Sequence, residues 1–322
     1  MPTTRSTIRQ ALHRLRVAYI EQGGERLAAT YRAMRRQRWT LRGITALIER
    51  IVPVQRFLEL AGQFDNQIGQ SGFHHGCHAV FEAIGFRWQV RVASEAVETL
   101  EDSPVLLFGN HPSLLTPFLI GASVKRSDVR VLTTEYVRRL IPSFVSHSFP
   151  VEVPISRIGS EWRKGGWKRA FTSQLNGLLG TRRTDEERRA VNRQSLRDLA
   201  EHIAEGGCAV MFPDGGADGR CPWFPGIAIV LQHIVQMPSD RAVHLIPVRE
   251  DHSSNRRIYA QLSQGLWASA KRRVMYRKRV CLSIGRPISL RDVVSPESSV
   301  EEILARLQLR HAMAFAGQAD HA

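Results

Sequence analysis

A histidine stands directly after a short apolar segment of the chain. Residues 105–108 are Val-Leu-Leu-Phe, typical of a buried strand, and Gly109, Asn110 and His111 follow at once. In α/β proteins, ligands bind beyond the carboxyl ends of parallel strands, so an imidazole here would face a binding site. A neutral imidazole can act there as a general base on a hydroxyl. Because most histidines are not catalytic, the alternative is a buried histidine with a structural role.

The residues after His111 indicate how it would be held. Pro112 and Ser113 suit the first turn of a helix. We therefore expect a helix to begin near Ser113, with free backbone N–H groups that stabilise an oxyanion beside His111.

Further segments with distinctive residues follow along the chain. One is Gly-Gly-Cys-Ala-Val-Met-Phe-Pro-Asp-Gly, whose glycines allow a ligand to approach the backbone closely. The six segments concerned are residues 105–117, 134–142, 153–157, 206–215, 244–248 and 280–288. Their motifs and their order resemble those of the glycerolipid acyltransferase superfamily, the glycerol-3-phosphate and lysophosphatidate acyltransferases. The resemblance does not extend to residues 1–83.

The resemblance implies an O-acyltransferase, a transferase of lipid metabolism and phospholipid biosynthesis. His111 would be the general base for an acceptor hydroxyl that attacks the thioester of a co-substrate, acyl-CoA or acyl carrier protein. No cofactor or metal is implied. His111 and Thr116 would occupy the positions of the catalytic pair. The substrate-binding residues implied in the same way are Asn110, Ser113, Arg157, Phe212, Pro213, Asp214, Gly215, Gly216 and Arg220.

The first departure from the family is Thr116, which stands in place of an aspartate. A threonine hydroxyl accepts a hydrogen bond but carries no charge, and hydrogen bonds to charged groups are about twice as strong. No carboxylate follows His111 closely in the sequence, so Asp128, Glu135 or Asp214 would have to approach through the fold. If the pocket retains a dyad, Thr116→Asp is expected to raise the rate. Both a weakly active enzyme and an inactive lipid-binding protein remain open.

The second departure lies in the glycine-rich segment, where Gly216 and Ala217 replace the family's Thr-Arg. In the family this arginine helps to bind the phosphate of the acceptor. Its absence favours a different head group, such as that of an aminolipid, a glycolipid or another hydroxylated lipid.

The net charge of +15 predicts a polyanionic partner. Nucleic acid and anionic lipid both fit, but no zinc-finger, helix-turn-helix or RNP-type signature accompanies the basic clusters, so nucleic acid is the weaker alternative.

Residues 104–124 contain His111, Asn110 and three prolines, a poor composition for a transmembrane helix. We expect a cytoplasmic protein that binds peripherally to the anionic inner face of the membrane. His74 and His78 share a helix face, but no second cluster completes a metal site.

The elements expected from hydrophobic periodicity define an α/β fold, a mostly parallel sheet flanked by helices. Expected helices cover residues 24–36, 40–51, 54–64, 73–84 and 184–204, and expected strands cover residues 88–92, 105–108, 129–132, 151–155, 208–212, 244–248 and 279–284. The expected division is a basic helical subdomain at 1–83, the acyltransferase-like α/β domain at 84–290 and a helical tail at 291–322.

Overall fold

The computed structural model describes residues 53–152, 183–214, 223–238, 241–251 and 280–316, with shorter pieces between 10 and 49 and residues 258 and 262. The strands are β1 Trp88–Val92, β2 Val105–Gly109, β3 Arg130–Thr134, β4 Ser148–Val151, β5 Cys208–Met211, β6 His244–Glu250, β7 Val280–Ile284 and β8 Ile288–Ser289. The helices are α3 Val54–Ala83, α4 Ser94–Asp102, α5 Thr116–Ser123, α6 Glu135–Leu140, α8 Asp185–Ala204, α9 Gly226–Gln236 and α12 Val300–Ala314, with short 3₁₀ turns at Pro142–His147 and Leu290–Asp292.

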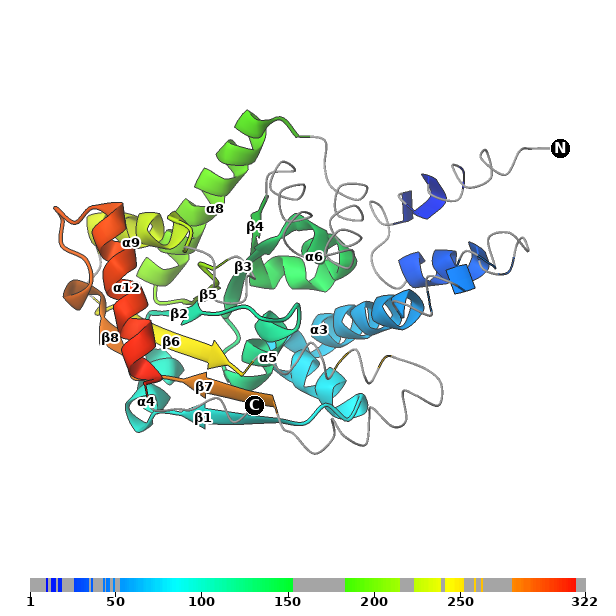
Figure 1. The fold of residues 1–322 in the computed structure, drawn as a ribbon, viewed down its shortest axis with the longest axis horizontal. Coiled ribbons are helices and arrows are strands. Elements are labelled where there is room, and N and C mark those ends of the chain that lie inside the picture. Colours follow the sequence, from blue (N-terminus) through cyan, green and yellow to red (C-terminus); the bar gives the residue numbers. More distant parts are fainter. Residues whose placement is uncertain are drawn as a thin grey trace.

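The described strands form one mixed sheet in the order β1-β7-β6-β2-β5-β3-β4, with β8 beside β6 (Figure 1). The pairs along the run from β6 through β2, β5 and β3 to β4 are all parallel. The strand β7 pairs with β6 in the antiparallel sense and with β1 in the parallel sense. The α/β fold with a mostly parallel sheet is therefore confirmed, although residues 279–284, expected to continue the parallel strands, run against β6.

Helices cover both faces of the sheet, and β2 shows why its sequence is apolar throughout. Val105 and Leu107 face the core formed with α3 and α5, whereas Leu106 and Phe108 face the core formed with α8, α9 and α12. A strand that is buried on both faces needs apolar residues at consecutive positions rather than at alternate ones.

The helix α3 is broken at Gly72, where φ is 78° and the helical backbone is interrupted. Glycine tolerates this positive φ at little cost. The expected break between helices 54–64 and 73–84 is confirmed, and residues 65–71 extend the first helix. After the break, the Phe73 ring packs edge-on against Phe118 of α5, with an angle of 68° between the ring planes, and His74 Nδ1 donates to the Gly121 carbonyl at 3.0 Å. The α3 helix thus packs into the same hydrophobic core as α5 and β2.

The long helix expected at 184–204 is confirmed as α8. The Thr184 hydroxyl accepts from the Glu187 N–H, and the Glu187 carboxylate accepts from the Thr184 N–H, which together form a capping box. The helix ends before Gly206, whose φ of 107° suits a glycine. In the described part, β4 ends at Val151, so the strand expected at 151–155 lies earlier, and residues 153–155 are outside the described residues.

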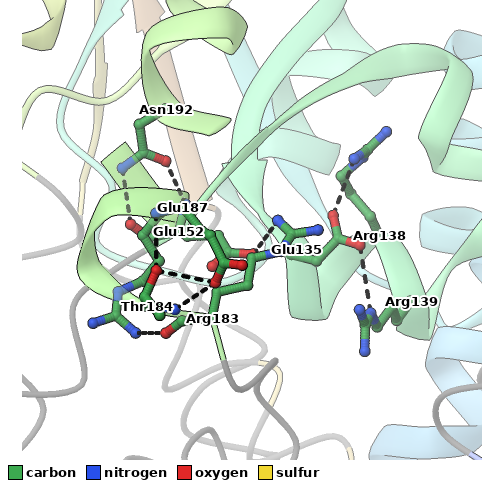
Figure 2. A network of polar contacts seen from close by, with 9 residues as sticks. Glu135, Arg138, Arg139, Glu152, Arg183, Thr184, Glu187 and Asn192 are labelled. Carbon is green, nitrogen blue, oxygen red and sulfur yellow. Dashed lines mark hydrogen bonds and ion pairs between the residues drawn. The ribbon is translucent and has the colours of Figure 1, made fainter. Parts of the chain in front are cut away.

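Polar contacts among Glu152, Arg183 and Asn192 connect the chain before and after residues 153–182 (Figure 2). The Arg183 guanidinium lies 2.6 Å from the buried Glu152 carboxylate. The Asn192 amide accepts from the Glu152 N–H at 2.8 Å and donates to the Glu152 carbonyl at 3.0 Å. Residues 152 and 183 are therefore held together at the end of β4 and the start of α8.

We expect Asn192→Ala to destabilise the protein by about 1–3 kcal/mol, because it leaves the Glu152 backbone groups without these two bonds. Urea denaturation followed by circular dichroism measures the loss. Gln194→Ala, which removes an exposed amide of the same helix, is the matched control and should change stability by less than about 0.5 kcal/mol. Equal losses in the two variants would show that the two Asn192 bonds make no specific contribution to stability.

None of the helices in the described part of the chain combines the length and the apolar character that crossing a bilayer requires.

Candidate functional site

His111 lies just beyond the carboxyl end of β2, and Gly109 makes this position possible. A Cβ built on Gly109 would lie 1.8 Å from the Val248 carbonyl oxygen of β6. Only glycine allows the two backbones to approach so closely at this point. The end of β2 is thus set directly against β6 where the chain turns towards His111.

The structure brings His111 together with the glycine-rich segment that follows β5. The imidazole packs against the Phe212 ring with 4.6 Å between ring centroids. The His111 backbone N–H donates to Asp214 Oδ2 at 3.3 Å, and Asp214 is only 2% exposed. The Pro213 carbonyl accepts the Phe224 N–H at 2.7 Å, which fixes the turn before α9. Two segments about a hundred residues apart therefore meet at one edge of the sheet.

Burial lowers the pKa of the His111 imidazole to about 4. Removing a charged group from water disfavours its charged form, so the half-buried His111 imidazole stays neutral at pH values where a fully exposed one is protonated. His111 is consequently in its base form at neutral pH.

This pKa predicts a loss of stability in acid. His111 titrates near 6.5 in the unfolded chain and near 4 when folded, so the unfolded chain binds the proton first as the pH falls. Stability should drop between pH 6.5 and 4, by at most about 3 kcal/mol from this residue, because water still reaches part of the ring. Denaturation curves of wild type and His111→Gln measure it: the variant should lose less stability over this range. Asp214 and Glu250, the carboxylates bonded to the His111 turn, are the same in both proteins, so they do not account for a difference. Identical dependence of stability on pH in the two proteins would contradict the effect of burial on the His111 pKa.

The helix after His111 starts later than expected. The helix α5 begins at Thr116, and Ser113 lies in the preceding turn, so the expectation of a helix start near Ser113 is wrong. The Ser113 N–H donates to Thr116 Oγ1 at 3.3 Å, and the Thr116 N–H donates to the Ser113 carbonyl at 3.1 Å. Residues 113–116 therefore form a tight turn, and the Thr116 hydroxyl satisfies the Ser113 N–H, a backbone group that a helix start would leave open.

The carboxylate nearest to Thr116 is Glu250, the last residue of β6. The Thr116 hydroxyl donates to Glu250 Oε2 at 2.6 Å, and Glu250 is 0% exposed. The Asn110 amide accepts from the Glu250 N–H at 2.9 Å and donates to the Glu250 carbonyl at 3.0 Å. Glu250 is thus bonded to the residue before His111 and to the residue that replaces the family's aspartate.

Sequence reasoning missed Glu250. Of the carboxylates that it considered, Asp128 pairs with Arg126 at 2.6 Å, and Glu135 pairs with Arg138 at 3.0 Å (Figure 2). Only Asp214 reaches the His111 turn. The sequence did place Glu250 shortly after the apolar residues 245–248, at the carboxyl end of an expected strand.

The remaining residues singled out from the sequence lie outside the described part of the chain. They are Arg157, Gly215, Gly216 and Arg220. Their roles in substrate binding stay predictions, as do those of Asn110, Ser113, Phe212, Pro213 and Asp214 towards a ligand.

The fold and the site define an α/β protein with a neutral histidine and a buried carboxylate at the carboxyl edge of its parallel strands. No family model matches the chain, and no curated protein does. Among solved structures, it is similar to the 1-acyl-sn-glycerophosphate (LPA) acyltransferase PlsC from Thermotoga maritima, at 16% sequence identity and a TM-score of 0.37 over 82% of each chain.

Proposed function

We propose that this protein transfers a fatty acyl group from acyl-CoA or acyl carrier protein to a hydroxyl of a lysolipid or related lipid. The observation that carries the proposal is the meeting of His111 with Phe212 and Asp214 at one edge of the sheet. These residues belong to the two segments that resemble the catalytic motifs of the glycerolipid acyltransferases. A neutral histidine at this edge of the sheet is suited to general-base chemistry.

The reaction needs no covalent intermediate on the protein. His111 takes the proton of the acceptor hydroxyl while the hydroxyl oxygen attacks the thioester carbonyl carbon. The tetrahedral intermediate then collapses, the C–S bond breaks, and the thiolate takes the proton back from the imidazolium. The products are one ester and one free thiol, and His111 returns to its neutral form.

Burial favours this role in one respect and opposes it in another. The neutral imidazole is ready to accept a proton, but a base with a pKa of about 4 is a weak one. A negative charge near the imidazole would compensate by stabilising the imidazolium. Thr116 cannot supply that charge, which is why a weakly active or inactive lipid-binding protein is the alternative.

The proposed place of action is the anionic inner face of a membrane, to which the protein would bind peripherally from the cytoplasm. The net charge of +15 supports attraction to anionic lipid. The absence of the family's Thr-Arg at Gly216 and Ala217 supports an acceptor whose head group is not glycerol phosphate. An aminolipid, a glycolipid or another hydroxylated lipid fits this departure.

An acceptor screen tests the proposal. The protein is mixed with acyl-CoA or acyl carrier protein thioesters, anionic vesicles and a panel of lysolipids, and thiol release is followed with a colorimetric reagent. We expect release that depends on one class of acceptor. Folded protein that binds the vesicles but releases no thiol with any acceptor would favour the inactive lipid-binding alternative. Salt-sensitive binding of nucleic acid in preference to vesicles would instead favour a nucleic-acid-binding protein.

A further inference from the structure

We propose that Glu250 is a positioning residue for His111: it fixes the turn that carries the imidazole and supplies, through Thr116, the negative charge that favours the imidazolium. This inference rests on the proposed function and adds to it a charged group that lies far from His111 in the sequence.

The geometry begins with the two ends of the His111 turn. Asn110 precedes His111, and its amide pairs with both backbone groups of Glu250, at 2.9 and 3.0 Å. Thr116 closes the turn, and its hydroxyl donates to the Glu250 carboxylate at 2.6 Å. One residue of β6 therefore holds the chain both before and after His111, and the bonds are protected from water because Glu250 is buried.

The bonds of Thr116 show how the carboxylate can act at a distance. A threonine hydroxyl has one proton to donate and two lone pairs to accept with. Its proton goes to Glu250, and the Ser113 N–H takes one lone pair. The hydroxyl is thereby oriented, and in our proposal its second lone pair accepts an imidazole N–H once a substrate is bound. Chains of hydrogen bonds polarise one another, which passes part of the effect of the Glu250 charge to His111.

The same contact explains the residue type at position 116. An aspartate there would place a second carboxylate within hydrogen-bonding reach of Glu250, and two such groups cannot both ionise easily. A hydroxyl can donate to Glu250, whereas an ionised carboxylate cannot. We therefore expect Thr116→Asp to lower the rate, opposite to the expectation from the sequence, unless the charge of Glu250 is removed at the same time.

Three variants, which remove the carboxylate at position 250, add one at position 116, or do both, test this role of Glu250. Glu250→Gln keeps the length of the side chain but removes the charge, and should lower kcat by about 10- to 100-fold with little change in KM, the range that loss of a residue orienting a functional group produces. The acid limb of the pH–rate profile should move to lower pH, because the imidazolium loses a stabilising charge. Thr116→Asp alone should also be slow. The double variant Thr116→Asp/Glu250→Gln, with the charge moved to position 116, should regain most of the wild-type rate.

The control is Asp251→Asn, which removes an exposed carboxylate next along the chain, bonded to the Cys281 N–H, and should leave kcat unchanged. A purely structural Glu250 would give a Gln variant with lower stability, an unchanged pH profile and no rescue in the double variant, and that result would overturn the inference. The proposed function fails separately, if wild type shows no acyl transfer or if His111→Ala keeps it. A Glu250→Gln variant as active as wild type, beside an inactive His111→Ala, would overturn the inference alone.

Discussion

Replacement of His111 by alanine is expected to reduce acyl transfer by about 10²- to 10⁴-fold, the range that a lost general base produces. The loss should appear in kcat, because His111 takes part in proton transfer and contributes little to binding the acyl chain. Steady-state thiol release with a saturating acceptor measures it. The folded state should survive, since the backbone bond from His111 to Asp214 does not depend on the side chain.

His75→Ala is the matched control for this variant. His75 is an exposed histidine of α3, so its removal tests whether any histidine-to-alanine change lowers the rate. We expect it to keep wild-type activity. A His111→Ala variant that is folded and retains most of its turnover would show that another group removes the proton.

Gly109→Ala is expected to have the largest effect on stability. The added methyl group would fall 1.8 Å from the Val248 carbonyl oxygen, and this oxygen belongs to the backbone of β6, not to a flexible side chain. Relief requires one of two paired central strands to move, so we expect a loss of about 4 kcal/mol or more, or no soluble folded protein. Guanidinium denaturation measures it, and any folded fraction should have lost activity because His111 is displaced with the strand end.

Gly226→Ala provides a comparison at another glycine near the site. A Cβ there would meet the end of the Met211 side chain at 3.2 Å, which a flexible side chain can relieve. We expect a change of less than about 1 kcal/mol. Similar losses in both variants would argue against the close approach of β2 and β6.

Much of the fold follows from local patterns in the sequence. The apolar run at 105–108 predicted a strand buried on both faces, and β2 is one. The charged stretch at 184–204 predicted a long helix, and the structure has α8 there, capped by Thr184 and Glu187. These elements are predictable because neighbouring residues alone determine hydrogen bonding and periodicity.

The direction of β7 and the start of α5 were not predictable in this way. The apolar pattern of residues 280–284 is the same in a parallel and in an antiparallel strand, so only its partners β1 and β6 fix its direction. Pro112 and Ser113 suit a helix start, but the Thr116 hydroxyl competes for the Ser113 N–H and makes a turn instead. Tertiary partners and side-chain bonds decide both cases.

Glu250 illustrates the limit for the site. It lies 140 positions from Asn110 in the chain, and their contact depends on β2 and β6 being neighbours in the sheet. Strand order is a property of the whole fold, so a search for a carboxylate close to His111 in sequence could not find it. The parallel pairing of two strands brings their carboxyl ends to one edge, and there the residues that follow them meet.

The most direct test of the central claim, direct transfer of an acyl group to a lipid hydroxyl, is to identify the products. An isotope-labelled acyl thioester, the acceptor found in the screen and anionic vesicles are incubated with the protein, and lipids, thiol and protein are analysed by mass spectrometry. We predict that the label appears in an ester of the acceptor, that free thiol is formed in equal amount, and that the protein carries no acyl group at any time. Label on the protein or in free fatty acid alone, or no transfer by folded, vesicle-bound protein, would contradict the account.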